Sequence, residues 1–138
     1  MGCDIHSSVQ VFEENQWIEV MDDWLNYRSY GLFGFLANVR NYSQVPVISI
    51  PRGLPADFRD LDGYGYHNAS WLALRELLNF DYDQKFINRR CGGTTLPEED
   101  GELTTIRDFL GSSYFNKLEE IKDFGPSEKV RVVFWFDN

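Results

Sequence analysis

Alternation of apolar and polar positions predicts a β-strand at each end of the chain. In residues 5–12, positions 5, 7, 9 and 11 form one face and positions 4, 6, 8 and 10 the other, because successive side chains of a strand point to opposite faces. Residues 13–16 are polar and residues 17–20 alternate again, so we expect an N-terminal hairpin. Residues 130–137 are β-branched and aromatic and predict a second long strand.

Between these ends, apolar residues recur at helical spacing. Residues able to cap a helix precede four such segments: Ser29; Asn68 or Ser70; Thr104 or Thr105; and Ser112 or Ser113. Residues 45–50 are β-branched but flanked by prolines, so we expect an edge strand at most. Residues 81–101 show no period and predict a long loop.

Strands at both ends with helices between them predict an α+β fold. We expect a small antiparallel sheet, formed by the N-terminal hairpin and the C-terminal strand, with three to four helices between. The apolar C-terminal strand should pair antiparallel with the first strand, because a strand that is apolar at most positions favours a central place. The length of 138 residues predicts a single domain, 1–138.

Composition excludes several classes of protein. The net charge of −9 argues against general nucleic-acid binding, which depends on neutralising phosphates with Lys and Arg. We find no apolar run long enough to span a membrane and no secretory leader. Cys3 and Cys91 are too few for a disulfide framework. We therefore expect a cytoplasmic protein that does not associate with a membrane.

The charge is unevenly distributed, because residues 26–56 and 84–97 contain no acid. Their basic residues favour a confined anion site. The alternative is that these arginines pair with surface carboxylates. The residues that we expect to bind such a ligand are Arg28, Tyr30, Arg40, Arg52, His67, Arg89 and Arg90.

Asp4 and His6 are the candidate catalytic residues of the first strand. They share a face, and Asp137 joins them if the terminal strands pair. A carboxylate beside a histidine orients the ring for acid–base work or for holding a divalent metal, although a solvated ion-pair network is the alternative. Cys3 and His6 have the spacing of half a zinc site, but residues three apart on a strand point to opposite faces, so we predict no metal ligands.

Two stretches combine aromatic rings with arginine or backbone donors. They are residues 27–30, with Arg28 between tyrosines, and the loop Tyr64-Gly65-Tyr66. Stacking surfaces of this kind suit a nucleobase, and they equally suit a protein interface.

Several segments together resemble a group of small phage and prophage proteins of unassigned function. These segments are the opening MGCDIH, PRGLP at residues 51–55, His67 with the following Ser70-Trp71-Leu72, and the closing VFWFDN. The resemblance implies a phage-encoded accessory protein and assigns no activity to any residue. Many such small proteins act against host defence, some by sequestering or degrading nucleotide immune signals.

The leading expectation is a phage accessory protein that binds a small anionic, nucleotide-type ligand and sequesters a host immune signal. One alternative is a phosphoesterase that uses Asp4 and His6 on a nucleotide substrate. Another is an acidic inhibitor that docks on a basic host factor. The aromatic surplus, 16% of residues, also suits a homo-oligomer. The sequence does not identify a cofactor.

Overall fold

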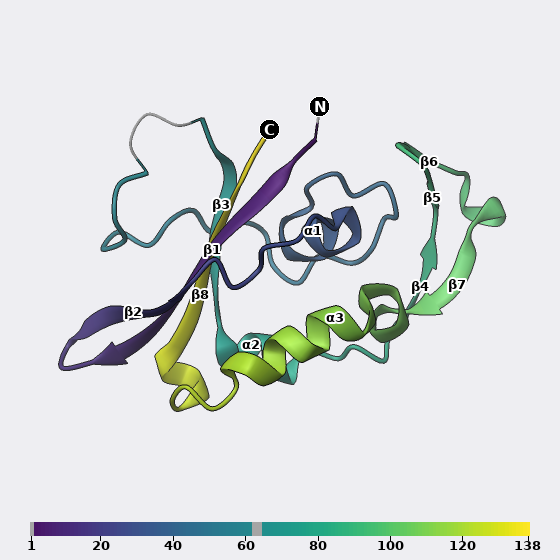
Figure 1. Cartoon of the computed structure of the whole chain (residues 1–138). Helices are drawn as coiled ribbons and strands as arrows, with labels where there is room; N and C mark the ends of the chain where they lie inside the picture. The colour runs from purple at the N-terminus through teal and green to yellow at the C-terminus, as the bar shows by residue number, and fades with distance from the viewer. Residues whose placement is uncertain (1, 62–64) are drawn as a thin grey trace. The chain divides into compact units, whose positions relative to one another are not determined.

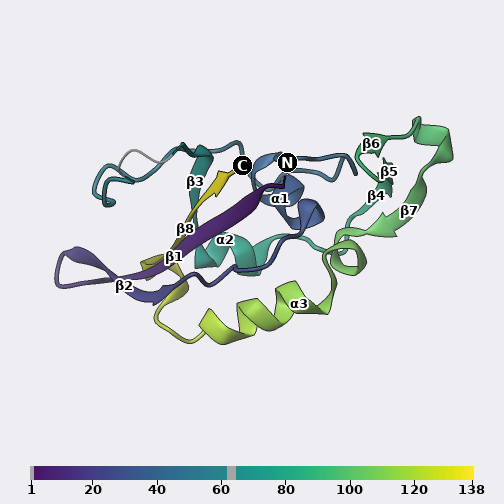
Figure 2. The same cartoon turned by 45° about the horizontal axis from the view of Figure 1, so that its top comes forward.

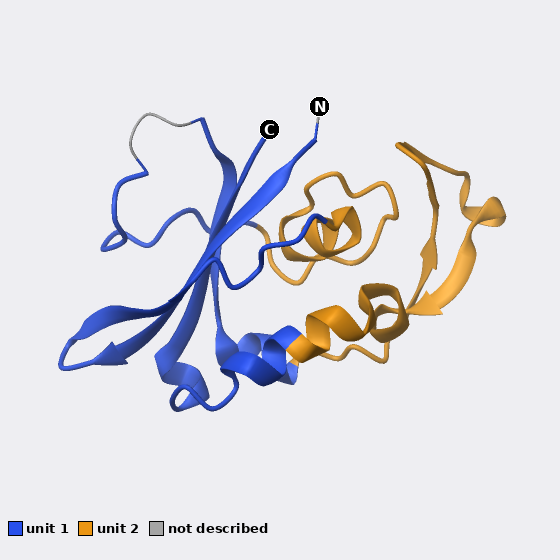
Figure 3. Ribbon diagram, viewed as in Figure 1, with its two compact units in different colours: residues 1–28, 51–79, 117–138 blue, residues 29–50, 80–116 orange. Residues whose placement is uncertain are grey.

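The computed structural model describes residues 2–61 and 65–138. Internal contacts divide the chain into two compact units, which Figure 3 distinguishes by colour. Unit 1 comprises residues 1–28, 51–79 and 117–138, and unit 2 comprises residues 29–50 and 80–116. The single domain stays a prediction.

Unit 1 is built on a four-stranded antiparallel sheet with the strand order β2-β1-β8-β3. The strands are β1 (Asp4–Glu13), β2 (Gln16–Asp22), β8 (Val130–Asp137) and β3 (His67–Ala73). Figures 1 and 2 show the two terminal strands running side by side in the middle of this sheet. The predicted hairpin and the predicted antiparallel pairing of the chain ends are both confirmed.

The two faces of β1 and β8 have different chemistry. Residues opposite each other share a face, so Ile5 lies beside Phe136 and Val9 beside Val132 on an apolar face that is buried throughout. Cys3 is also fully buried. The other face carries polar residues and is covered at its centre but half-exposed at the end where the chain termini lie.

The prediction that a helix begins at Asn68 or Ser70 is wrong about where the helix starts. Residues 67–73 form β3, and α2 spans Leu74–Asn79. The buried Ser70 hydroxyl accepts a hydrogen bond from the Arg52 backbone N–H (3.0 Å) rather than capping a helix. Pairing with β8 satisfies the backbone of this segment, and that long-range contact outweighs the helical spacing of its apolar residues.

Unit 2 contains one helix, short strands and the first part of a longer helix. Helix α1 (Tyr30–Ala37) begins where predicted, because the Ser29 hydroxyl accepts from the Leu32 N–H (3.2 Å). The other elements are β4 (Lys85–Asn88), β7 (Glu102–Thr105), β5 (Arg90–Cys91), β6 (Thr94–Thr95) and the short η1 (Glu98–Asp100). The expectation of a long loop at residues 81–101 is therefore wrong, because β4 pairs with β7 and β5 with β6.

The expectation of an edge strand at residues 45–50 is also wrong. This segment forms no strand, and its Ile48 N–H donates to the Phe35 carbonyl (2.9 Å). The flanking prolines lack the N–H groups that a ladder would need. Helix α3 (Ile106–Ile121) is interrupted at Gly111, whose φ of 79° is non-helical, so the expectation of two successive short helices is confirmed.

Among the described residues the chain has three α-helices and eight strands, which confirms the α+β class. The short η2 (Ser127–Lys129) leads into β8. None of the helices in the described part of the chain has the length and apolar character needed to cross a membrane.

Candidate functional site

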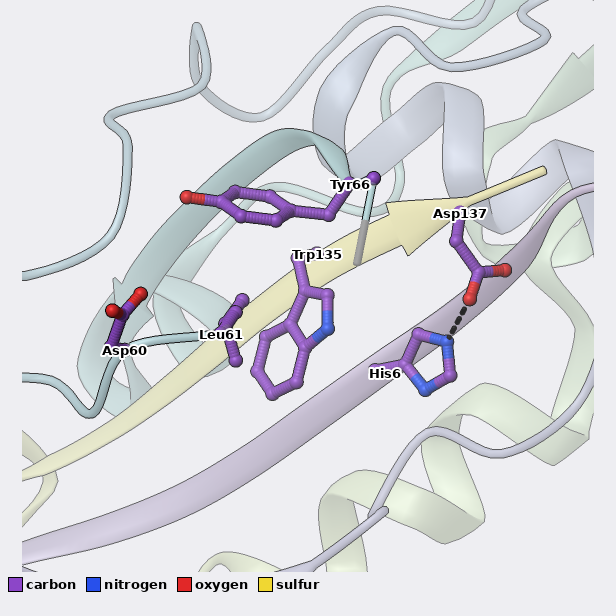
Figure 4. A pocket seen from close by; sticks show the side chains of 7 residues that line it. His6, Asp60, Leu61, Tyr66, Trp135 and Asp137 are labelled. Atoms are coloured by element: carbon purple, nitrogen blue, oxygen red, sulfur yellow. Dashed lines mark hydrogen bonds and ion pairs between the residues drawn. The ribbon is translucent and has the colours of Figure 1, made fainter. Parts of the chain in front are cut away.

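A histidine–aspartate pair lies at the exposed end of the sheet in unit 1. The register places His6 opposite Trp135 and Asp4 opposite Asp137. His6 Nε2 lies 2.8 Å from Asp137 Oδ2, as Figure 4 shows, and the two side chains are 42% and 46% exposed. Asp4 instead pairs with Arg28, whose Nη2 lies 2.9 Å from Asp4 Oδ1. The predicted polar face therefore exists, but the carboxylate that holds His6 is Asp137.

This pairing fixes how His6 can act. With Nε2–H donating to the Asp137 carboxylate, Nδ1 remains to accept or donate a proton. The carboxylate also orients the ring. The pair can thus serve either as a proton acceptor for a bound molecule or as a hydrogen-bonding edge that recognises one.

An aromatic pocket of about 390 Å³ opens beside this pair within unit 1. The rings of His6 and Trp135 stack at 5.9 Å and 19°, so the two side chains form one continuous surface. In Figure 4, Trp135 lies between Leu61 and His6, with Tyr66 beside it. The residues lining the pocket are His6, Asp60, Leu61, Gly65, Tyr66, Trp135 and Asp137.

The wall formed by Asp60 and Leu61 is attached to the sheet by the three residues that precede it. Phe58 packs on Trp135 (ring centroids 5.6 Å apart), and the Arg59 guanidinium lies 5.7 Å from the same ring. Arg59 also pairs with Glu19 at 3.1 Å. These contacts hold the segment against the sheet and so keep the pocket open beside Trp135.

Arg131 provides the third attachment. Its side chain is buried, and its guanidinium lies 4.2 Å from the centroid of the Trp17 ring. The guanidinium donates from Nε to Gln10 Oε1 (2.7 Å) and forms an ion pair with Asp57 (3.1 Å). Burial lowers the pKa of Arg131, although Asp57 opposes that change. Arg131 lies on the same strand face as Asp137, further along β8, and it anchors the loop.

A second pocket of about 210 Å³ borders the other side of the site. It is lined by residues 4–6, Asp23 and residues 26–28, so His6 contributes to both pockets. Asp23 is held in place because its N–H donates to the Ser7 carbonyl (2.8 Å). The Leu25 N–H donates to the buried Ser7 hydroxyl (2.9 Å). This segment is therefore tied directly to β1.

The remaining predicted ligand residues of unit 1 are engaged with other side chains. Arg52 forms a two-point pair with Glu76 (2.8 and 2.6 Å) and lies 4.8 Å from the Trp71 ring centroid. The hydrogen bond between them raises the pKa of Arg52 and lowers the pKa of Glu76. Arg28 and Arg52 thus pair with carboxylates, as the alternative interpretation expects. His67 lies 2.6 Å from Asn138 and 2.8 Å from Asn68.

Unit 2 brings together three of the other predicted residues. The guanidinium groups of Arg40 and Arg90 lie 5.2 and 5.5 Å from the centroid of the Tyr30 ring. Arg89 is directed elsewhere, since its Nε donates to the Leu96 carbonyl (2.7 Å). The seven predicted residues are therefore divided between the units, with Arg28, Arg52 and His67 in unit 1.

Sequence reasoning missed several members of the aromatic pocket. Tyr66 was recognised in an aromatic loop and Trp135 belongs to the predicted C-terminal strand, but Phe58, Asp60 and Leu61 were not singled out. They belong to an irregular segment, where no periodicity indicates which side chains face the sheet. Tyr64, the other ring of the predicted aromatic loop, lies outside the described residues.

The ligands for a metal ion are not assembled in the described part of the chain. No group of three or more His, Cys, Asp or Glu residues that could hold a metal occurs among residues 2–61 and 65–138. Cys3 is buried and Cys91 is exposed, and both are free thiols.

Comparison with known proteins adds no information about this site. The chain matches no protein-family model, no curated protein and no solved structure. Fold and site together define a small α+β protein with an aromatic pocket and a histidine–aspartate pair at its edge, and its function is inferred from that geometry.

Proposed function

We propose that this chain binds a nucleotide-type ligand whose planar ring lies on Trp135. The observation that supports this most is the aromatic pocket with the His6–Asp137 pair at its edge. Its volume of about 390 Å³ is at the small end of the range of about 300–1,000 Å³ typical of ligand pockets. Aromatic floors with a few fixed polar groups are typical of such sites.

The polar groups of the pocket suit the hydrogen-bonding edge of a nucleobase. The Asp60 carboxylate offers acceptors, and it forms no hydrogen bond or ion pair with the described residues. His6 offers either a donor or an acceptor at Nδ1. A base has an alternating donor and acceptor edge, so these groups select among rings that stack equally well.

Charge determines which part of the ligand the pocket holds. Two of the residues lining the pocket, Asp60 and Asp137, are acidic, and none is Lys or Arg, so a phosphate inside the pocket would meet like charge. We therefore assign the ring to this pocket and expect a phosphate, where the ligand has one, to lie outside it. The resemblance to phage proteins makes nucleotide immune signals the ligands to test first, with sequestration as the resulting role.

The test is titration calorimetry with nucleosides, nucleotides, cyclic nucleotides and ADP-ribose. Stacking of a base on an aromatic side chain contributes about 1–3 kcal/mol, so W135L should weaken binding by about tenfold or more. W71L is the matched control, because Trp71 lies in the same sheet but does not line the pocket. If no compound gave heat at about 1 mM, where a binding free energy near −4 kcal/mol is detectable, the proposal would be wrong.

A second candidate function is phosphoester hydrolysis, for which the 2.8 Å pairing of His6 with Asp137 supplies an oriented proton acceptor. His6 would take a proton from water as it attacks phosphorus, and the proton would pass to the departing alcohol oxygen. Chromatography of the incubated ligands separates the two functions, because a binding protein returns the ligand intact.

A substitution at His67 is a closely matched control for this experiment. Each histidine stacks on an aromatic residue of β8, His6 on Trp135 and His67 on Phe136 (6.1 Å, 26°), and each contacts one of the last two residues. Turnover that H6Q abolishes and H67Q retains would establish hydrolysis at this site. Turnover that survives in H6Q would exclude His6 from the chemistry.

A further inference from the structure

The two pockets of unit 1 share His6, so a single ligand can occupy both. The aromatic pocket offers the flat surface of Trp135. The second pocket, of about 210 Å³, is lined by the polar residues Asp4, His6, Asp23, Asn26 and Arg28 together with Ile5 and Tyr27. A molecule that fills both must have a planar part and a polar part joined across His6. This requirement rests on the proposed function and makes it more specific.

The second pocket is rich in hydrogen-bond acceptors. Asp4 and Asp23 present carboxylates, and Asn26 presents an amide that both donates and accepts. Carboxylates are the groups that commonly bind the hydroxyls of a ribose, because each oxygen accepts a hydrogen bond from an O–H group. A hydroxyl-bearing group therefore matches this set of side chains.

A phosphate matches it less well. The Arg28 guanidinium is already paired with Asp4 (2.9 Å), so it compensates one carboxylate within the pocket. Asp23 forms no ion pair with the described residues, and its charge would repel a phosphate placed beside it. The balance of charge thus favours a neutral, polyhydroxyl group over an anionic one.

The backbone that carries Asp23 is also held in place before any ligand arrives. Asp23 is bonded through its N–H to Ser7, and the chain two residues later is bonded to the Ser7 hydroxyl. Asp4 is held by Arg28. A backbone fixed in this way loses little conformational freedom on binding, which reduces the cost of binding there.

We propose that the second pocket is a subsite for the pentose of a nucleoside, with Asp23 and Asn26 as the residues that determine specificity for its hydroxyls. The ligand is then a ribonucleoside or a nucleotide held through its base and sugar. The free base fills only the aromatic pocket. A ribonucleoside should therefore bind about tenfold or more tightly than its base.

The experiment is calorimetry with one base in four forms: the free base, its ribonucleoside, its 2′-deoxyribonucleoside and its 5′-monophosphate. D23N keeps the shape of the side chain, and asparagine tolerates the positive φ of 56° at this position. D22N is the matched control, because Asp22 is an adjacent exposed acid that lines neither pocket. We expect D23N and N26A to weaken ribonucleoside binding and to leave free-base binding unchanged, while D22N changes neither.

The outcomes separate the two proposals. If the free base binds as tightly as the ribonucleoside, and D23N affects neither, the sugar subsite is wrong while the aromatic site stands. If D23N strengthens binding of the monophosphate alone, the pocket holds the phosphate and the assignment to a sugar is overturned. If none of the four forms binds, the aromatic site itself is wrong, and the subsite fails with it.

Discussion

The ion pair between the buried Arg131 and the exposed Asp57 gives the sharpest prediction about stability. The Arg131 side chain is only 7% exposed, whereas that of Asp57 is 57% exposed. Removing the partner of a buried charge leaves that charge without compensation and costs about 3–5 kcal/mol. Because water reaches Asp57 and already screens part of the attraction, we expect D57A to cost less, about 2 kcal/mol.

R131M should destabilise the protein for a different reason. Methionine keeps much of the packing on Trp17, but the buried Gln10 oxygen loses its donor, which costs about 1–3 kcal/mol. Loss of the cation–π contact adds about 0.5–2 kcal/mol, and removal of a buried charge offsets part of the total. We expect a net loss of about 2 kcal/mol in the free energy of unfolding.

The two substitutions should not be additive. Without Arg131, Asp57 is an ordinary exposed carboxylate, and its removal should change stability by no more than about 0.5 kcal/mol. The coupling free energy is then about 1.5 kcal/mol, well above the scatter of about 0.3–0.5 kcal/mol for independent sites. Urea unfolding of the four proteins, followed by circular dichroism and tryptophan fluorescence, measures it.

D60A is the control for this cycle, because Asp60 belongs to the same loop and forms no ion pair with the described residues. We expect it to lie within about 0.5 kcal/mol of the parent protein. If the double variant instead lost the sum of the two single losses, Arg131 and Asp57 would not be coupled. The loop would then depend on its aromatic contacts and on the Arg59–Glu19 pair.

Three further predictions concern titration and capping. The hydrogen bond from Arg52 lowers the pKa of Glu76 in the folded state, so the stabilisation by ionised Glu76 is present above the unfolded-state pKa and is lost as pH falls through the folded-state pKa. E76Q should therefore flatten the acid side of a stability–pH profile. An unchanged profile would count against the Arg52–Glu76 pair. Burial raises the pKa of Tyr82 to about 12 from 10.0, so stability should fall as pH rises from about 10 to 12. Y82F should remove that alkaline loss of stability. It should also cost about 1 kcal/mol at neutral pH, because it loses the 2.6 Å hydrogen bond to Tyr114. If Y82F lost stability at alkaline pH as the parent does, another group would be responsible. S29A should lower the free energy of unfolding by about 1 kcal/mol, because it removes the cap of α1. S29N is the conservative control, since asparagine can also cap a helix. Equal urea midpoints for the two variants would exclude a capping role.

Local pattern was sufficient where one strand face is buried and the other is polar. The alternation in β1 predicted that strand and its two faces, and the apolar, β-branched sequence of β8 predicted that strand and its antiparallel pairing with β1. It failed at β3, where Trp71, Leu74 and Leu78 suggested one helix. These residues lie across the junction of β3 and α2, and the strand exists because β8 supplies its hydrogen-bond partners from about 60 positions away in sequence.

The candidate site shows the same division. Alternation placed Asp4, His6 and Asp137 on one face, which is a property of the backbone and is independent of neighbours. Which carboxylate holds the histidine depended on side-chain reach and on Arg28, which comes from another segment and binds Asp4. The pocket wall depended on an irregular loop anchored by Arg131, and such long-range contacts leave no periodic trace in sequence.

By itself, the sequence determined the α+β class, the terminal strands, the cap of α1 and the polar face that carries the candidate chemistry. These features follow from the period of a strand or from a hydroxyl next to a helix, and both are local. Only the tertiary structure decided the pairing of His6 with Asp137, the aromatic pocket on Trp135 and the second pocket beside it. Each of these brings together residues from segments far apart in the chain, and their contact energies exist only once the sheet has formed.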